Sequence, residues 1–157
     1  MNIFYLDHDV NKCARFHCDK HVVKMIVEYT QILSSAYYFT GESNLAPYKL
    51  THANHPCCRW ARTSLSNWIW LRNLALSLCK EYTFRFGKKH KCEKILKSMK
   101  PPSLIDRGFT NIICVMDNEY ITGSDAVENY RNLYRHGKRH LLSYKRREIP
   151  EWLRENN

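Results

Sequence analysis

The chain has 157 residues, of which 44% are hydrophobic and 13% aromatic, and its formal net charge is +10. This size and composition favour one folded domain over residues 1–157 with a single core and exclude a disordered chain. No apolar run is long enough to span a membrane, and the first residues lack the apolar core of a secretory signal. The excess of lysine and arginine indicates a polyanionic partner, with nucleic acid first.

The seven cysteines form an odd set without the regular spacing of a disulfide framework. We therefore expect free thiols in a reducing compartment, which is the cytoplasm, or the host cytoplasm if the protein is viral. The chain has few glycines and many lysine, isoleucine and asparagine residues, a composition that suits a virus or phage product.

The first expected elements are a short extended segment and a long helix. Residues 1–8 are predicted to be extended. Asp9 is a suitable N-cap for a helix that runs to about Phe39 and is closed by Gly41. The stretch that follows, residues 41–54, is rich in turn formers and is predicted to be a loop.

Two helices are expected next, separated by a break. Asn54 is placed to cap a helix starting near His55 and Pro56, since proline suits a first helical turn. A break is expected near residues 63–66. Residues 67–86 then have the pattern of a strong amphipathic helix that Gly87 stops.

The C-terminal half contains shorter elements. Residues 88–99 suggest a basic helix ended by two prolines, and residues 101–123 a buried loop or a lone strand. Asp125 and Glu128 match a capping box for a helix through about His136, and the remaining basic segment is expected to be partly helical. The predicted fold is mainly α, a compact single domain of about four to six helices with a short N-terminal extended segment.

Four titratable residues fall on one stripe of the first long helix. His17, His21, Lys24 and Glu28 follow the i, i+4, i+7, i+11 spacing and are flanked by apolar side chains. This pattern predicts a largely buried helix whose titratable edge opens onto a cleft. A glutamate beside a lysine in apolar surroundings suits general acid/base chemistry or Schiff-base formation. The structural alternative is an ion pair with hydrogen-bonded histidines.

Histidines and cysteines also suggest a zinc site as an alternative. The candidate ligands are Cys13, His17, His21, His52, His55, Cys57 and Cys58. Four such ligands suffice for tetrahedral zinc, but the chain has no CxxC pair and no HExxH motif. We therefore assign no metal and no other cofactor, and keep a zinc-stabilised phage interaction protein as an alternative.

Basic residues interleaved with aromatic ones suggest contacts with nucleic acid. Arg59 and Arg62 lie near several tryptophans in the second helical region. The C-terminal candidates for phosphate binding are Lys138, Arg139, Lys145, Arg146 and Arg147. Such side chains neutralise phosphates while tyrosine and tryptophan stack on exposed bases. The alternative is an ordinary solvated basic face.

Asp19, His21 and Glu28 form the pattern D-x-H-x6-E, which resembles the first helix of the phage-type pyrimidine-dimer DNA glycosylases, the endonuclease V family of T4-like phages. The layout is also similar, with a loop leading to an His55–Pro56 step and a tryptophan- and leucine-rich helix that ends in EYTFRFG. The resemblance extends over roughly the first 90 residues and weakly to the basic, aromatic tail.

The resemblance implies base excision through an imine. In that family the N-terminal α-amine attacks the sugar C1′ of a damaged pyrimidine, and the helix glutamate supports the chemistry. An α-amine ordinarily has a pKa near 7.7–8.0, so a useful fraction is uncharged at neutral pH. An extruded nucleotide gives access to the sugar.

By matched position, Glu28 is expected to be the catalytic carboxylate, with His21 beside it. The expected nucleophile is the Met1 amine or, as a substitute one helical turn from Glu28, Lys24. The expected substrate-binding residues are His17, Asn54, His55, Arg59 and Arg62.

The predicted function is therefore that of a DNA base glycosylase, or glycosylase/AP lyase, acting on damaged or modified pyrimidines. The expected partner is DNA, with no membrane association, and the expected state is a monomer. A non-enzymatic nucleic-acid-binding module is the second alternative, besides the zinc-stabilised protein.

Overall fold

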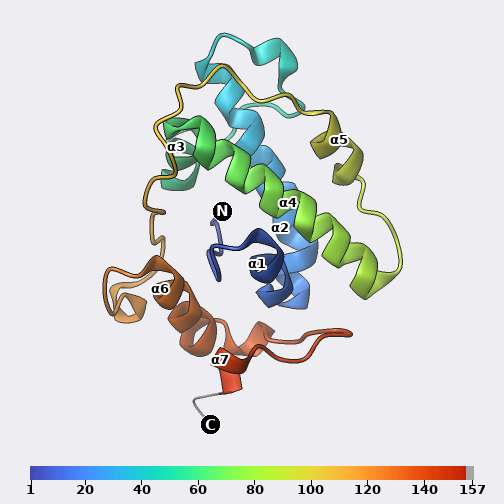
Figure 1. Ribbon diagram of the computed structural model, residues 1–157, viewed down its shortest axis with the longest axis vertical. Coiled ribbons are helices and arrows are strands. Elements are labelled where there is room, and N and C mark those ends of the chain that lie inside the picture. Colours follow the sequence, from blue (N-terminus) through green and yellow to red (C-terminus); the bar gives the residue numbers. More distant parts are fainter. Residues whose placement is uncertain (155–157) are drawn as a thin grey trace.

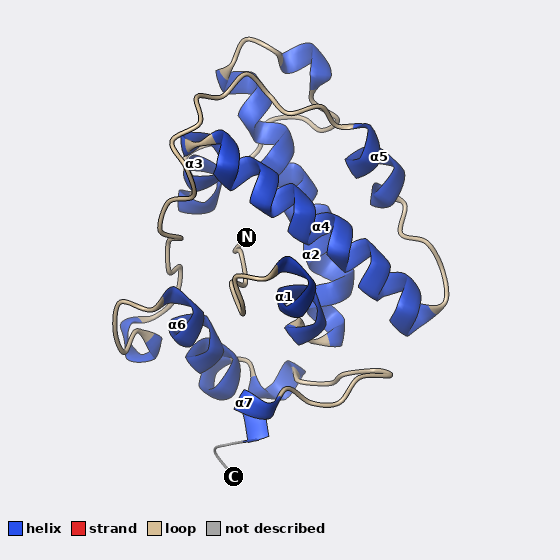
Figure 2. Ribbon diagram, in the orientation of Figure 1, coloured by secondary structure: helices blue, strands red, loops and turns tan. Residues whose placement is uncertain are grey.

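The computed structural model describes residues 1–154, and over this range the chain is helical with connecting loops and no strand (Figure 2). The α-helices are α1 (Val10–Phe16), α2 (Asp19–Ser35), α3 (Pro56–Thr63), α4 (Leu65–Phe86), α5 (Cys92–Ser98), α6 (Ala126–Asn132) and α7 (Glu151–Arg154). Short helical turns cover Ala36–Phe39, Ser43–Leu45, Asn118–Tyr120, Leu133–Gly137 and Arg139–Leu141. The mainly α prediction is confirmed.

The expected long helix from Asp9 to Phe39 is instead two helices, α1 and α2, so this prediction is wrong. Asp9 does cap α1, accepting from the N–H groups of Asn11 and Lys12. The break lies at His17 and Cys18, whose backbone is extended. The guanidinium of Arg85 donates to the carbonyls of Arg15 and His17, both at 2.8 Å. Because these carbonyls at the end of α1 are satisfied from α4, the chain can leave the helix there.

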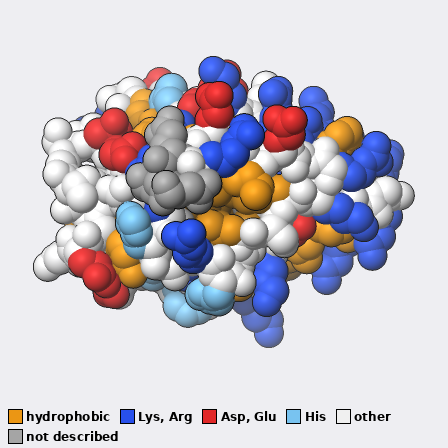
Figure 3. All heavy atoms as spheres, turned by 90° about the horizontal axis from the view of Figure 1, so that it is seen from below, with side chains coloured by type: hydrophobic (Ala, Val, Ile, Leu, Met, Phe, Trp, Pro, Cys, Tyr) orange, Lys and Arg blue, Asp and Glu red, His pale blue; other side chains and the backbone are white. Residues whose placement is uncertain are grey.

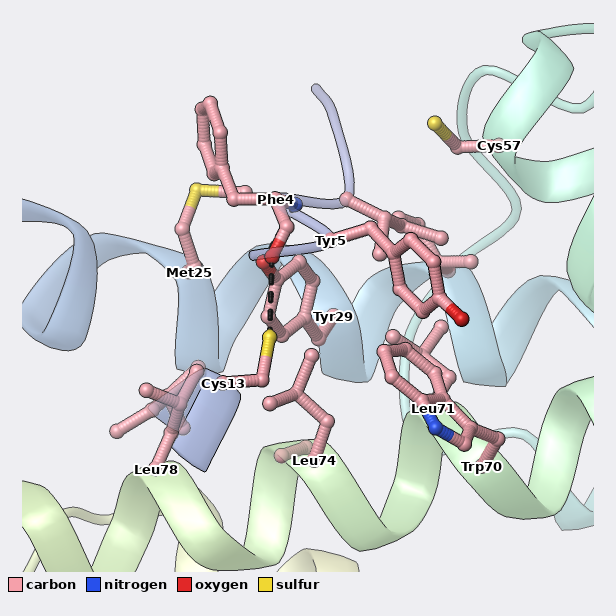
Figure 4. Close-up of a cluster of buried hydrophobic side chains, with 14 of the residues drawn as sticks. Phe4, Tyr5, Cys13, Met25, Tyr29, Cys57, Trp70, Leu71, Leu74 and Leu78 are labelled. Atoms are coloured by element: carbon pink, nitrogen blue, oxygen red, sulfur yellow. Dashed lines mark hydrogen bonds between the residues drawn. The ribbon is translucent and has the colours of Figure 1, made fainter. Parts of the chain in front are cut away.

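Helix α4 is the centre of the packing and contacts α1, α2, α3 and α5 (Figure 1). Leu71, Leu74 and Leu78 are fully buried and face the N-terminal half of the chain (Figure 4). The expected break before this helix is confirmed, since Ser64 is extended between α3 and α4. The expected stop is also confirmed, because Gly87 has the left-handed conformation with φ of 73°.

The N-terminal segment is part of the core. Ile3, Phe4, Tyr5 and Leu6 are buried, and the thiol of Cys13 donates to the carbonyl of Phe4 at 3.2 Å (Figure 4). Figure 1 shows the first residues inside the ring formed by α1, α3, α4 and α6. A chain end held in this way is ordered by its neighbours.

Two expected helix starts are displaced. His55, not Asn54, caps α3, since its Nδ1 accepts from the N–H of Cys57 at 3.1 Å. The basic helix after Gly87 begins only at Cys92, because residues 88–91 form a loop and turn.

The segment between α5 and α6 is a loop rather than a strand. It is fastened to the α3–α4 corner by Thr110, which accepts from Trp60 and bonds with Asn67. Asp106 binds the hydroxyls of Ser64 and Ser66 on the same corner. The segment is therefore a loop, as one alternative predicted, but the expectation that it is buried is wrong, since within residues 101–123 only Pro102 and Ile112 are buried.

Helix α6 begins at the predicted cap and ends near the predicted residue. Asp125 accepts from the N–H groups of Val127 and Glu128. The capping box is incomplete, because the Glu128 carboxylate pairs with Arg135 instead of reaching back. A wider helical turn, Leu133–Gly137, continues the helix to the point where Gly137 meets the ring of Tyr120.

Candidate active site

A cleft of about 310 Å³ opens between the N-terminal segment, α2 and the turn that follows α6. Its lining is Met1, Asn2, Phe4, Lys20, His21, Lys24, Met25, Glu28, Lys138 and Leu141. Three lysines, one carboxylate and the α-amine of Met1 are therefore gathered in one cavity. This composition suits an anionic ligand.

The carboxylate of Glu28 lies between two amines. Its Oε1 is 3.3 Å from the nitrogen of Met1, and its Oε2 is 3.6 Å from Nζ of Lys24. Glu28 is 16% exposed and Lys24 69% exposed. Oε2 is buried without a hydrogen-bond partner, so one acceptor of the carboxylate is free to take a proton.

His21 forms part of the cleft wall as a neutral group. Its ring stacks on Phe4 at 4.0 Å between centroids, and its Nδ1 lies 2.6 Å from the hydroxyl of Tyr134. Burial lowers the pKa of His21 to about 3, with smaller contributions from His17, Lys138 and Lys24. The imidazole is therefore uncharged near neutral pH and acts through hydrogen bonding and stacking.

His17 does not line the cleft, so the expected stripe of four residues on one helix is wrong. His17 lies in the turn before α2 and is fully buried. Its Nδ1 lies 2.7 Å from the Cys13 carbonyl and its Nε2 lies 2.8 Å from the hydroxyl of Tyr29. That hydroxyl accepts from the N–H of Phe4, so His17 supports the cleft wall from behind.

The other expected substrate-binding residues lie outside the cleft lining. His55 is half-buried, and its pKa is lowered by burial and by the positive charge of the Met1 amine. Asn54 and Arg59 are exposed. Arg62 donates to the Ala53 carbonyl at 2.6 Å and stacks on a phenylalanine ring, so it is occupied within the fold.

Of the C-terminal basic residues, only Lys138 lines the cleft. Arg139, Lys145 and Arg146 are exposed, and Figure 3 shows lysine and arginine side chains gathered at one end of the lower face. Arg147 is already paired, because its Nε and Nη2 donate to the Glu81 carboxylate at 2.8 and 3.1 Å. The predicted phosphate contact of Arg147 stays a prediction, and the Glu81 pair leaves its guanidinium less available for it than those of Arg139 and Arg146.

The zinc alternative lacks its ligand cluster. Within residues 1–154, no group of three or more histidine, cysteine or acidic side chains is arranged to hold a metal ion. All seven cysteines are free thiols, and Cys58 instead contacts the sulfur of Met1 at 3.7 Å. In the same range, no helix has the length and apolar character needed to cross a membrane.

Four residues in or near the site were not assigned a role from the sequence. Lys20 precedes Lys24 by one helical turn, so its spacing is a signal that identifies it. Asn2 and Leu141 carry no such signal, because they reach the cleft through contacts with distant parts of the chain. Asp19 belongs to the D-x-H-x6-E pattern, which gives no sign that its carboxylate accepts from Arg85, Ser143 and the Lys145 N–H.

Comparison with known proteins gives one match. The family model for pyrimidine dimer DNA glycosylase matches residues 1–95, which are 95 of the 157 residues. No curated protein and no solved structure matches the chain. The matched range contains Met1, His21, Lys24 and Glu28, whereas Lys138 and Leu141 of the same cleft lie beyond it.

Proposed function

Because the chain belongs to the pyrimidine dimer DNA glycosylase family, we propose that it excises a damaged or modified pyrimidine from DNA through an imine with the Met1 amine, and then cleaves the abasic site as a lyase. The observation that carries the proposal is the 3.3 Å approach of the Met1 nitrogen to Glu28 inside the lysine-lined cleft. A nucleophile and a proton acceptor within such reach can act together on one sugar carbon.

In the first step, the uncharged Met1 amine attacks C1′ of the target nucleotide. The N–C1′ bond forms from the amine lone pair, while the C1′–N1 bond breaks and its electron pair leaves with the base, which takes up a proton. Glu28 accepts the proton that the attacking nitrogen loses. Opening of the sugar then breaks the C1′–O4′ bond, O4′ takes a proton, and an iminium remains between C1′ and Met1.

The lyase step uses the same carboxylate. Glu28 returns its first proton to O4′ and then removes a proton from C2′, which the iminium has acidified. The C3′–O bond breaks and its electron pair leaves with the 3′ phosphate. Water finally hydrolyses the imine and restores the free amine. Oε2 of Glu28 supports this role, because it has no hydrogen-bond partner in the fold and Nζ of Lys24 lies 3.6 Å away.

Met1 is favoured over Lys24 as the nucleophile for two reasons. A lysine amine has an ordinary pKa near 10.4, against about 8 for an α-amine, so fewer lysines are uncharged at neutral pH. Lys24 is also the more exposed of the two, at 69%. We assign Lys24, Lys20 and Lys138 to the phosphates that flank the extruded nucleotide, and His21 to the wall that orients it.

The experiment that tests the proposal is borohydride trapping on duplex DNA that contains an abasic site, with mass spectrometry of the N-terminal peptide. UV-irradiated DNA is the second substrate. We expect an adduct on Met1, retention of the adduct in Lys24→Gln, and its loss when a glycine precedes Met1. A glycine added after residue 157 is the matched control.

Glu28→Gln removes the proton acceptor while keeping the shape of the side chain. We expect strand cleavage to fall by about a hundredfold or more, with DNA affinity close to native. Native cleavage in Glu28→Gln, or an adduct that maps to Lys24, would contradict the assignment. Salt-sensitive DNA binding with no adduct on either substrate would favour the binding-module alternative.

A further inference from the structure

We propose that Asn2, held in place by Tyr130, is the positioning residue that keeps the Met1 amine against Glu28. The inference rests on the proposed function, since it concerns the same nucleophile. It assigns a role to two residues that are 128 positions apart in the chain.

The side chain of Asn2 is engaged through both of its polar atoms. Its Nδ2 donates to the Val115 carbonyl at 2.8 Å, and its Oδ1 accepts from the N–H of Ile3 at 2.8 Å. The same Oδ1 lies 2.9 Å from the hydroxyl of Tyr130. These bonds fix the backbone of residue 2, and therefore the direction in which residue 1 leaves it.

Tyr130 anchors this arrangement from the core. Its ring is fully buried, and its hydroxyl accepts from the N–H of Val115 at 3.2 Å. The single hydroxyl proton is shared between Asn2 Oδ1 and the Ile113 carbonyl, which is 2.7 Å away. Burial raises the pKa of Tyr130 well above its ordinary value, so the hydroxyl keeps the proton that it donates.

The side chain of Met1 is seated on the other side of its amine. It is 5% exposed, and its sulfur lies 3.7 Å from the thiol of buried Cys58. With Asn2 fixed and this side chain enclosed, the amine has little freedom except toward the cleft. The Met1 nitrogen still stands 3.3 Å from Glu28, slightly beyond a close hydrogen bond, which leaves it able to reach a sugar carbon.

The test uses the full chain with Asn2→Leu and Tyr130→Phe. Leucine keeps the branched shape and the number of heavy side-chain atoms of asparagine and, being large, does not create the small second residue after which a first methionine is commonly removed. Intact mass verifies that Met1 is present in each protein. The matched controls are Asn118→Leu, an exposed asparagine, and Tyr38→Phe, which loses a hydroxyl bond to the Tyr48 carbonyl outside the cleft.

Two rates are measured. The first is reductive methylation of the Met1 amine without DNA, followed in the N-terminal peptide. The second is borohydride trapping on abasic DNA. We expect Asn2→Leu to be methylated several-fold faster and trapped about tenfold to a hundredfold more slowly, since small misplacements of a reacting group have effects of this size. Tyr130→Phe should change both rates in the same directions but less, because Asn2 keeps its bond to Val115.

The outcomes separate the inference from the proposed function. Faster methylation of both variants, with no trapping by any protein including the native one, supports the positioning role and contradicts the imine chemistry. Native trapping with both variants unchanged in both rates overturns the positioning role. Slower trapping without a change in methylation also overturns it, since the amine has then not moved. If Asn2→Leu fails to fold, the comparison of Tyr130→Phe with Tyr38→Phe decides.

Discussion

Replacement of Arg85 by methionine should destabilise the protein more than any surface change. The Arg85 side chain is fully buried and makes four hydrogen bonds. Two go to the carboxylates of Glu81 and Asp19, at 2.9 and 3.1 Å, and two go to the carbonyls of Arg15 and His17. Methionine fills a similar volume but satisfies none of these acceptors.

The expected loss in the free energy of unfolding depends on which hydrogen-bond acceptors remain without a donor after Arg85→Met. Glu81 keeps its hydrogen bond from Arg147, and Asp19 keeps its hydrogen bond from the Lys145 N–H. Each carboxylate therefore still has a hydrogen-bond donor after the substitution. The two backbone carbonyls at the end of α1 lose a charged donor each. Loss of one partner from a buried pair typically costs about 3–5 kcal/mol. For a domain of this size, that is a fall in melting temperature of roughly 6–20 °C.

The assay is urea unfolding of Arg85→Met beside Lys97→Met. Lys97 is 65% exposed and pairs with Glu93 at 3.4 Å, so its loss should change stability by less than about 0.5 kcal/mol. A free energy of unfolding for Arg85→Met within about 1 kcal/mol of native would refute the reasoning. It would mean that water or a shifted backbone replaces the guanidinium at little cost.

Two further predictions concern pH and packing. His17 and His21 have pKa values lowered by burial to about 4 and about 3, below the 6.5 of an unfolded histidine. The unfolded chain therefore binds more protons, and stability should fall as pH is lowered from about 6.5 to 5, by up to about 1.4 kcal/mol per pH unit for each histidine. Urea unfolding at pH 7, 6 and 5 measures this, and constant stability across that window would contradict it. Gly137→Ala places a Cβ 2.9 Å from the Tyr120 ring and should cost about 1–3 kcal/mol in urea unfolding, whereas Gly123→Ala, with open space, should be nearly neutral. Equal stability of the two glycine variants would count against the close packing at Gly137.

Local signals predicted helix ends well. Asp9, Gly87 and Asp125 act on neighbours a few residues away, so their effect can be seen in the sequence. The break after α1 has no such signal, because it depends on Arg85, which lies 68 positions from His17. The sequence therefore predicted one helix where the structure has two.

The same distinction applies to the site. Helical spacing predicted that His21, Lys24 and Glu28 share one face, and all three line the cleft. A role for the Met1 amine beside Glu28 was expected only from the family resemblance. No role was predicted for its neighbour Asn2. The partners of Asn2, Val115 and Tyr130, come close to it only when the whole chain folds.

The buried start of the chain has a consequence for biosynthesis. Asn2 is 128 positions before its partner Tyr130 and 113 positions before its partner Val115. A nascent chain that ends before Val115 holds Glu28 but lacks both long-range partners of the Asn2 side chain, Val115 and Tyr130. On the proposed positioning role of Asn2, the Met1 amine would thus be fixed beside Glu28 only after the chain has been synthesised through Tyr130. A fragment limited to residues 1–95, the range that carries the family match, would have the same deficiency.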